Sequence, residues 1–260
     1  MSLAAAGIPE TPEIRPCQKF EGHTHWVTDV IHLPREQQIM TSSLGSLRVW
    51  NLQSGKQIGN DWGDGGMTIA LSPDGQKVVS GGPNGGLKLW DTNTSEVIAE
   101  WTGHTTYVTS VCWSQDGGRV TSGSNDGTAR VWDMKSGQTV LAIETGLSEV
   151  EAAIYSPDTA MIATGGGSKD LKEFITIWDA KTGKLIANLK GHTGIVYCLA
   201  WTADGSRVYA HQIDGPAQAY ASLCGHRHRR HVSTSVGEDG DPRRRVDKAS
   251  RRARGDGGGG

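Results

Sequence analysis

Three residue types that together perform nucleophilic catalysis occur close together in this chain: His104, Ser122 and Asp126. In a hydrolase the acid orients the histidine, the histidine takes the serine proton, and an oxyanion hole stabilises the charge that develops. The serine of many such enzymes lies in a Gly-x-Ser-x-Gly turn, but the residues around Ser122 do not form one. The residue types therefore permit a hydrolase site, and no motif supports it.

Other catalytic or ligand-binding chemistry has less support. The glycine-rich stretches 63–66 and 81–86 lack the Lys-Ser/Thr pair of a phosphate-binding loop. The histidines are dispersed except for His226, His228 and His231, where metal binding would be nonspecific. We therefore expect no metal, no cofactor and no small-molecule substrate, and we predict that the protein is not an enzyme.

The elements that would position the three side chains follow from a repeat. Four tryptophans recur at intervals of 40, 42 and 46 residues, and aspartate directly follows three of them. A period in this range is typical of stacked supersecondary units, none of which can bury its apolar face alone. The repeated residues are Trp50, Trp90, Asp91, Trp132, Asp133, Trp178 and Asp179.

The unit at 103–145 is the most regular. Its segment 108–113 is rich in β-branched and aromatic residues, which favours a strand. Turn signals at 116–117 and 125–127 separate this segment from the strands that follow. The sequence therefore predicts four antiparallel strands in each unit. In this unit, strands three and four are expected at 128–132 and 139–143.

Gly-His pairs open the first, third and fifth units, at His23, His104 and His192. With these landmarks the chain resembles the WD-repeat β-propeller family over residues 14 to 209. The resemblance implies an all-β propeller of four full four-stranded blades and a degenerate fifth, in an incomplete or strained ring. It also implies that residues 14–20 form an outer strand, which in this family completes the last blade.

The resemblance implies a structural role for the possible triad. In this family the matching positions form a buried chain of hydrogen bonds, here His104, Ser122, Asp126 and Trp132. We favour this role over catalysis, because a buried and fully bonded histidine has no access to substrate. The other units depart from the pattern. The first has Leu44 and the second Asn84 at the aspartate position, and the fourth has no histidine.

Proteins of this family bind partners through the rim of one face. The matching positions here include Trp26, Tyr107, Ile195 and Asn125, and large aromatic residues on an exposed rim are typical binding anchors. The alternative, which we weigh equally, is that the two aromatic side chains pack against neighbouring blades. The resemblance thus implies protein partners that the sequence does not identify.

The repeat fails near the C-terminus. Ala210 replaces the serine of the fifth unit, and Tyr220-Ala221 stands where Trp-Asp is expected. Residues 226–260 carry ten Lys/Arg against five Asp/Glu, within a chain of net charge -2, and we expect this segment to be disordered. One interpretation is an arm for nucleic acid or nuclear import. The other, which we favour, is a truncated gene product or frame artefact that has left the repeat.

These inferences divide the chain into a flexible N-terminus at 1–13, a propeller at 14–225 and the basic tail at 226–260. The four cysteines lack a Cys-x-x-Cys pair, no secretory signal or membrane span is evident, and a eukaryotic cytoplasmic location is expected, or a nuclear one if the tail is genuine. The function predicted is a noncatalytic protein–protein interaction scaffold, with a nucleic-acid-associated factor as the alternative. The blades are expected at 22–59, 60–102, 103–145, 146–190 and 191–225.

Overall fold

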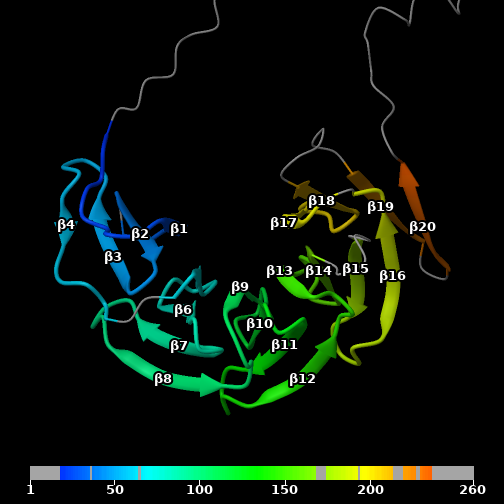
Figure 1. Ribbon diagram of the computed structural model, residues 1–260, viewed down its shortest axis with the longest axis horizontal. Helices are drawn as coiled ribbons and strands as arrows, with labels where there is room; N and C mark the ends of the chain where they lie inside the picture. Colours follow the sequence, from blue (N-terminus) through cyan, green and yellow to red (C-terminus); the bar gives the residue numbers. More distant parts are fainter. Residues whose placement is uncertain are drawn as a thin grey trace, which may run out of the picture.

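The computed structural model describes residues 18–35, 37–63, 66–167, 174–192, 194–212, 219–226 and 229–235. Every regular element in these residues is a strand, and the strands form five antiparallel sheets of four. Figure 1 shows the sheets following one another around an arc, with the first and fifth sheets on opposite sides of an opening. The described sheets therefore have the all-β blade architecture that the sequence predicts, but they do not close into a ring.

Consecutive strands pair within each sheet. The first sheet contains β1 (Val27–His32), β2 (Gln38–Ser43), β3 (Ser46–Asn51) and β4 (Gln57–Ile58), and the second contains β5 (Thr68–Leu71), β6 (Lys77–Gly81), β7 (Gly86–Asp91) and β8 (Val97–Thr102). The third contains β9 (Val108–Trp113), β10 (Arg119–Ser124), β11 (Thr128–Asp133) and β12 (Thr139–Glu144). The fourth contains β13 (Glu149–Tyr155), β14 (Met161–Gly167), β15 (Phe174–Asp179) and β16 (Leu185–Lys190). The fifth contains β17 (Val196–Trp201), β18 (Arg207–Gln212), β19 (Ala219–His226) and β20 (Arg229–Ser235).

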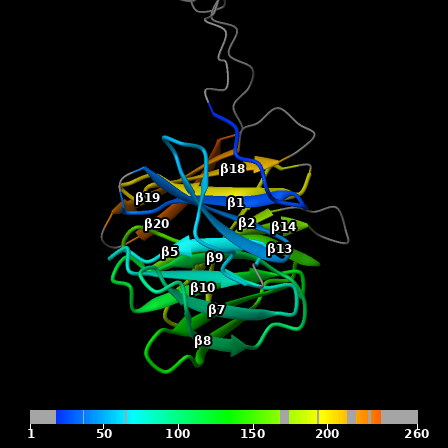
Figure 2. The same ribbon diagram turned by 90° about the vertical axis from the view of Figure 1, so that its left-hand side faces the viewer.

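Position in the sheet determines how strongly a strand is buried. The first strand of each sheet lies on the inside of the arc and the fourth on the outside (Figure 1). In the side view of Figure 2 the first sheet lies above the second, and the buried clusters join residues of successive sheets, so neighbouring sheets pack face to face. The second strands of the first four sheets are largely buried, and every residue of β14 is buried, whereas several residues of β18 are exposed. The outer strands β8 and β12 alternate between exposed and covered side chains, as expected of a half-buried strand.

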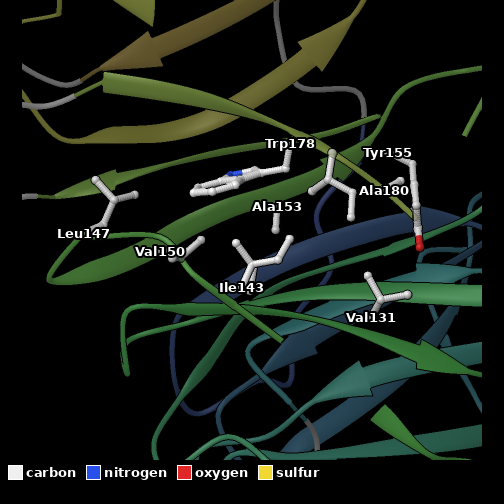
Figure 3. Close-up of a cluster of buried hydrophobic side chains, with 10 residues drawn as sticks. Val131, Ile143, Leu147, Val150, Ala153, Tyr155, Trp178 and Ala180 are labelled. Carbon is white, nitrogen blue, oxygen red and sulfur yellow. The ribbon is translucent and has the colours of Figure 1, made fainter. Parts of the chain in front are cut away.

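The hydrophobic core lies between the sheets. Figure 3 shows one cluster, where Val131 and Ile143 of the third sheet meet Val150 and Trp178 of the fourth. Burial of each large aliphatic or aromatic side chain in such a cluster stabilises the fold by about 1.5–3 kcal/mol. Because the clusters lie between sheets, each sheet depends on its neighbours for its core.

A close approach recurs between successive sheets. A Cβ atom built on Gly123 would lie 2.7 Å from Cγ1 of Val150, and one on Gly165 would lie 2.7 Å from Cγ1 of Val196. In both cases the glycine is in the second strand of one sheet, and the valine is in the first strand of the next sheet. Only hydrogen fits at the glycine. The position equivalent to Gly165 in the fifth sheet, judged by register, is His211, which is exposed.

The fifth sheet departs from the sequence prediction in two ways. Strand β20 lies within the segment 226–260 that was expected to be disordered. Its backbone pairs with that of β19 from Tyr220↔Ser235 to His226↔Arg229. The fifth sheet thus extends to Ser235, past the boundary expected at 225. In addition, the residue opposite Val208 is Ala221. The tryptophan position is thus occupied by alanine, one residue later than the expected Tyr220.

The N-terminal prediction falls mostly outside the described residues. Of the outer strand expected at 14–20, the structure describes residues 18–20, and these are not in a strand. Phe20 instead packs edge-on against Trp50, with the ring centroids 5.8 Å apart. The end of this segment therefore lies against the first sheet.

Candidate functional site

The four residues predicted to form a hydrogen-bonded chain meet inside the third sheet. Nδ1 of His104 lies 3.0 Å from Oδ2 of Asp126, and Nε2 lies 2.7 Å from Oγ of Ser122. The indole Nε1–H of Trp132 donates to the same serine oxygen over 2.8 Å. Because an indole N–H can only donate, Ser122 accepts from Trp132 and its own proton is available to His104. We call these four residues the third-sheet network.

Burial and hydrogen bonding set the charges in this network. Burial lowers the pKa of His104 and outweighs the Asp126 carboxylate, which raises it. Burial alone would raise the pKa of Asp126, but donors on Thr128 and Thr105, together with His104, lower it to about 2. The favoured state is therefore a neutral imidazole whose Nδ1–H donates to an ionised carboxylate.

This arrangement does not give Ser122 the properties of a nucleophile. Ser122 is fully buried, and Oγ is enclosed between His104 and Trp132. A substrate carbonyl would have to reach an atom that no solvent reaches, and a nucleophile needs that access. The network instead satisfies buried polar groups and fixes the segment that enters the sheet.

The Asp126 carboxyl is expected to make the third sheet sensitive to acid. Its pKa of about 2 in the folded chain lies below the ordinary value of 3.8. The ionised group therefore contributes stability that is fully present above about pH 4 and is lost as the pH falls toward 2. In urea unfolding from pH 7 to pH 3, the advantage of the wild type over Asp126→Asn should shrink at the acid end. An advantage independent of pH would contradict this expectation.

The first sheet has a similar network that the sequence did not reveal. His23 Nε2 lies 2.6 Å from Oγ1 of Thr41, which also accepts the indole N–H of Trp50 over 2.7 Å. His23 Nδ1 lies 3.1 Å from Oγ of Ser46. Ser46 corresponds in register to Thr128, whose hydroxyl oxygen likewise lies 3.0 Å from Nδ1 of His104. The sequence signal that could have indicated this network is Thr41, a hydroxyl residue nine positions before Trp50.

The remaining sheets keep only parts of the network. Trp90 donates to Ser80 and Trp178 donates to Thr164, each over 2.9 Å, and no histidine joins either pair among the described residues. In the fifth sheet His192 Nδ1 lies 2.9 Å from Oε1 of Gln212. The buried Nε2 of His192 has no hydrogen-bond partner within the described chain, since Ala210 brings no hydroxyl there.

The aspartates that follow the tryptophans stabilise turns. Oδ1 of Asp133 accepts the backbone N–H of Ser136 over 2.8 Å, and Asp91 and Asp179 accept the matching N–H groups over 3.0 and 2.8 Å. Hydrogen bonds from Ser136 hold the pKa of Asp133 below its usual range. These carboxylates therefore shape the turn between the third and fourth strands.

The predicted partner-binding residues lie beside the starts of inner strands. Trp26 and Tyr107 precede β1 and β9, and Ile195 precedes β17. Trp26 is 90% exposed and Tyr107 is 40% exposed, whereas Ile195 is half-buried. The backbone N–H of Asn125 donates to the carbonyl of Tyr107 over 3.0 Å. Asn125 therefore lies beside Tyr107 at the same end of the third sheet.

The face of β1 that points away from the second sheet exposes apolar side chains, a feature that the sequence analysis missed. Val27 and Val30 are 52% and 57% exposed, whereas the residues at the same positions of β9, Val108 and Val111, are 0% and 8% exposed. The difference arises because the second sheet covers β9, but no described sheet covers β1. We call Trp26, Val27 and Val30 the β1 face.

Two negative findings apply to the part of the chain that the structure describes. Its His, Cys, Asp and Glu side chains form no group of three that could hold a metal ion. No helix in these residues is long and apolar enough to cross a membrane.

Comparison with known proteins agrees with this geometry. A family model for the WD domain, G-beta repeat, matches residues 14–51, 65–91, 95–133 and 183–210. It does not match 134–182, a region that includes β12 of the third sheet and β13–β15 of the fourth. The fourth sheet therefore keeps its hydrogen-bonded strands although the family model finds no repeat over most of it.

Curated relatives carry the same kind of repeat. The chain is 28% identical to autophagy-related protein 16 of Arabidopsis thaliana over 71% of its own length and 37% of the relative. It is 27% identical to small ribosomal subunit protein RACK1y of Oryza sativa over 77% of its length and 49% of the relative. It is also 27% identical to the U3 small nucleolar RNA-associated protein 15 homolog of Xenopus laevis over 60% of its length and 29% of the relative.

The chain thus spans less than half of each of these proteins. The regions matched by the family model make up half of the chain, and they contain the buried Trp50, Trp90 and Trp132 with the strands that pair around them. The protein therefore belongs to the WD40 repeat family.

Proposed function

We propose that this protein is a noncatalytic scaffold that binds a protein partner through the β1 face and the adjacent rim. WD40 repeat proteins are generally interaction scaffolds, and the third-sheet network offers no accessible nucleophile. The observation that carries the proposal is the exposure of Trp26 beside Val27 and Val30. Tryptophan is highly buried on average. A tryptophan that is exposed beside two exposed valines therefore marks a candidate interaction site.

The chemistry of the β1 face indicates the kind of partner. Its side chains carry no charge, and Asp29, the acidic residue of β1, is turned toward the second sheet, where it accepts the backbone N–H of Ile69 over 2.9 Å. A partner that presents apolar side chains is therefore favoured over a charged polymer. Trp26 is the expected central contact, with Tyr107 further along the rim. We place this interaction in the cytoplasm.

The test is affinity capture with the full chain, followed by measurement of Kd for the captured protein. Trp26→Ala is expected to weaken binding by about 30-fold or more, because a buried tryptophan contact is typically worth 2 kcal/mol or more. Tyr107→Ala should have a smaller effect in the same direction. Val140→Ala, at a half-exposed valine of the outer strand β12, is the matched control and should bind like the wild type.

Circular dichroism and thermal unfolding should show that the variants remain folded. Capture of the same proteins at the same affinity by a folded variant that carries both Trp26→Ala and Tyr107→Ala would remove this surface from consideration.

A second candidate function is association with RNA. Two relatives are named for the small ribosomal subunit and for U3 small nucleolar RNA, and residues 226–260 have an excess of basic residues. Ribonuclease treatment during the same capture experiment separates the two functions. Partners that remain after treatment support the scaffold. Partners that are lost, together with the loss caused by replacing Arg243, Arg244 and Arg245 with glutamine, support RNA.

A further inference from the structure

The second sheet contains a pocket of about 450 Å³, within the size range of small-ligand sites. It lies between the β6–β7 turn, the end of β8 and the β2–β3 hairpin of the first sheet. Its lining includes Ser80, Asn84, Gly86, Lys88, Trp101 and Leu44. None of these side chains belongs to the β1 face.

The pocket occupies the place that an imidazole ring fills in the third sheet. In the strand register, Ser80 lies opposite Lys88 as Ser122 lies opposite Arg130. Counting from these serines, Asn84 corresponds to Asp126 and Gly86 corresponds to Thr128. These are the positions that surround His104 in the third-sheet network. The pocket is therefore lined by the equivalents of the histidine's own partners.

A shorter connection explains why no histidine reaches this place. Trp101 stacks on Trp132, and nine positions later Ser110 pairs with the second strand of its sheet. Trp62 packs on Trp90 in a tilted arrangement. Thr68, the equivalent of Ser110, follows Trp62 after six positions. The connection from Trp62 to Thr68 is thus three residues shorter than that from Trp101 to Ser110, and it contains no histidine. Residues 64 and 65 of this connection lie outside the described residues.

The lining has the hydrogen-bonding groups that a neutral imidazole needs. Ser80 is buried and accepts the indole N–H of Trp90 over 2.9 Å. No described residue accepts the proton of Ser80, whereas the proton of Ser122 is directed to a ring nitrogen. Asn84 lies in the β6–β7 turn, where its side-chain carbonyl can accept a ring N–H.

The charge of the walls also suits a neutral ring. Lys88 and Glu100, both in the wall, lie 3.5 Å apart as an ion pair, so together they add no net charge.

We propose that this pocket binds a neutral imidazole group, with Ser80 donating to one ring nitrogen and Asn84 accepting from the other. The ring is supplied either by a histidine side chain of a peptide or by a free imidazole compound. The volume exceeds that of one ring, so the pocket also has space for atoms on either side of a histidine. This inference is independent of the proposed scaffold function.

The test is calorimetric titration of the full chain at pH 8 with imidazole and, separately, with a short peptide that contains one histidine. We expect saturable binding of at least one of them. Pyrrole, which has the N–H but lacks the acceptor nitrogen, should not bind. Binding of the peptide identifies a histidine side chain as the source, whereas binding of imidazole alone identifies a free compound. Absence of saturable binding by both would overturn the proposal.

Variants assign the binding to this pocket. Ser80→Ala should weaken imidazole binding about tenfold, and Ser80→Thr should retain it, because Thr41 and Thr164 accept the same indole hydrogen bond in their sheets. Asn84→Ala changes an exposed residue and therefore tests the site without removing a buried group; it should weaken binding several-fold. Imidazole binding that is unchanged in both Ser80→Ala and Asn84→Ala would show that it occurs elsewhere.

Discussion

Replacement of Ser122 by alanine is expected to lower the free energy of unfolding by about 2–5 kcal/mol. The serine oxygen binds both His104 Nε2 and the indole N–H of Trp132. Alanine leaves two buried polar groups without partners, each at a cost of about 1–3 kcal/mol. Chemical denaturation followed by circular dichroism measures the change. The effect should be among the largest for a substitution that removes a single atom.

The fourth sheet offers a matched control for this experiment. Thr164 accepts the indole N–H of Trp178, and the described residues of this sheet bring no histidine to it. Thr164→Ala should therefore cost less, about 1–3 kcal/mol, although part of that cost is the lost methyl group. Ser122→Thr should be nearly neutral, because Thr41 makes both contacts in the first sheet. If Ser122→Ala lowered the free energy of unfolding no more than Thr164→Ala does, the expected contribution of the histidine hydrogen bond would be contradicted.

Replacement of Gly123 by valine is expected to destabilise the protein by about 3 kcal/mol or more. The new Cβ would lie 2.7 Å from Cγ1 of Val150 and 3.3 Å from Cβ of Ala153. These atoms belong to the next sheet, so the collision would push the third and fourth sheets apart rather than move one side chain. The expected observable is a lower melting temperature together with greater exposure of apolar surface.

A double-mutant cycle tests the cause. Gly123→Ala is expected to cost about 1–3 kcal/mol in the wild type and clearly less when Val150 is already alanine, because the shortened side chain leaves room for the methyl group. The two substitutions would then be coupled by at least 0.5 kcal/mol. Simple additivity would indicate that the glycine matters through its backbone and not through the contact with Val150.

Much of the fold could be predicted because the relevant signals are local. Tryptophan spacing and turn residues such as those at 116–117 depend on a few neighbouring positions, and they predicted four strands in each unit. The residues of the third-sheet network could also be identified, because all four side chains of the pattern are present in one unit. Departures from that pattern were harder to interpret. Ser46 was missed because its counterpart Thr128, also four positions before a tryptophan, was not among the residues of the predicted pattern.

The missed features depend on packing between sheets. Val27 resembles Val108 in sequence context, and only the arrangement of sheets determines that one is exposed and the other buried. The register that places Ala221 opposite Val208 depends on pairing across residues that carry no repeat landmark. Strand β20 has no strand periodicity in its sequence, and it is specified by backbone hydrogen bonds to β19. Local patterns carry little information about such pairing.

The histidine at position 211 gives the arc two unlike ends. The first sheet presents Val27, which has the shape to fit against a glycine, but the fifth sheet offers the larger His211 at the glycine position. Head-to-tail growth of copies would require Val27 of one molecule to occupy the space of an imidazole on the next. Such growth is the route by which heterologous contacts produce open filaments. His211 therefore disfavours head-to-tail packing of the first sheet of one copy on the fifth sheet of another.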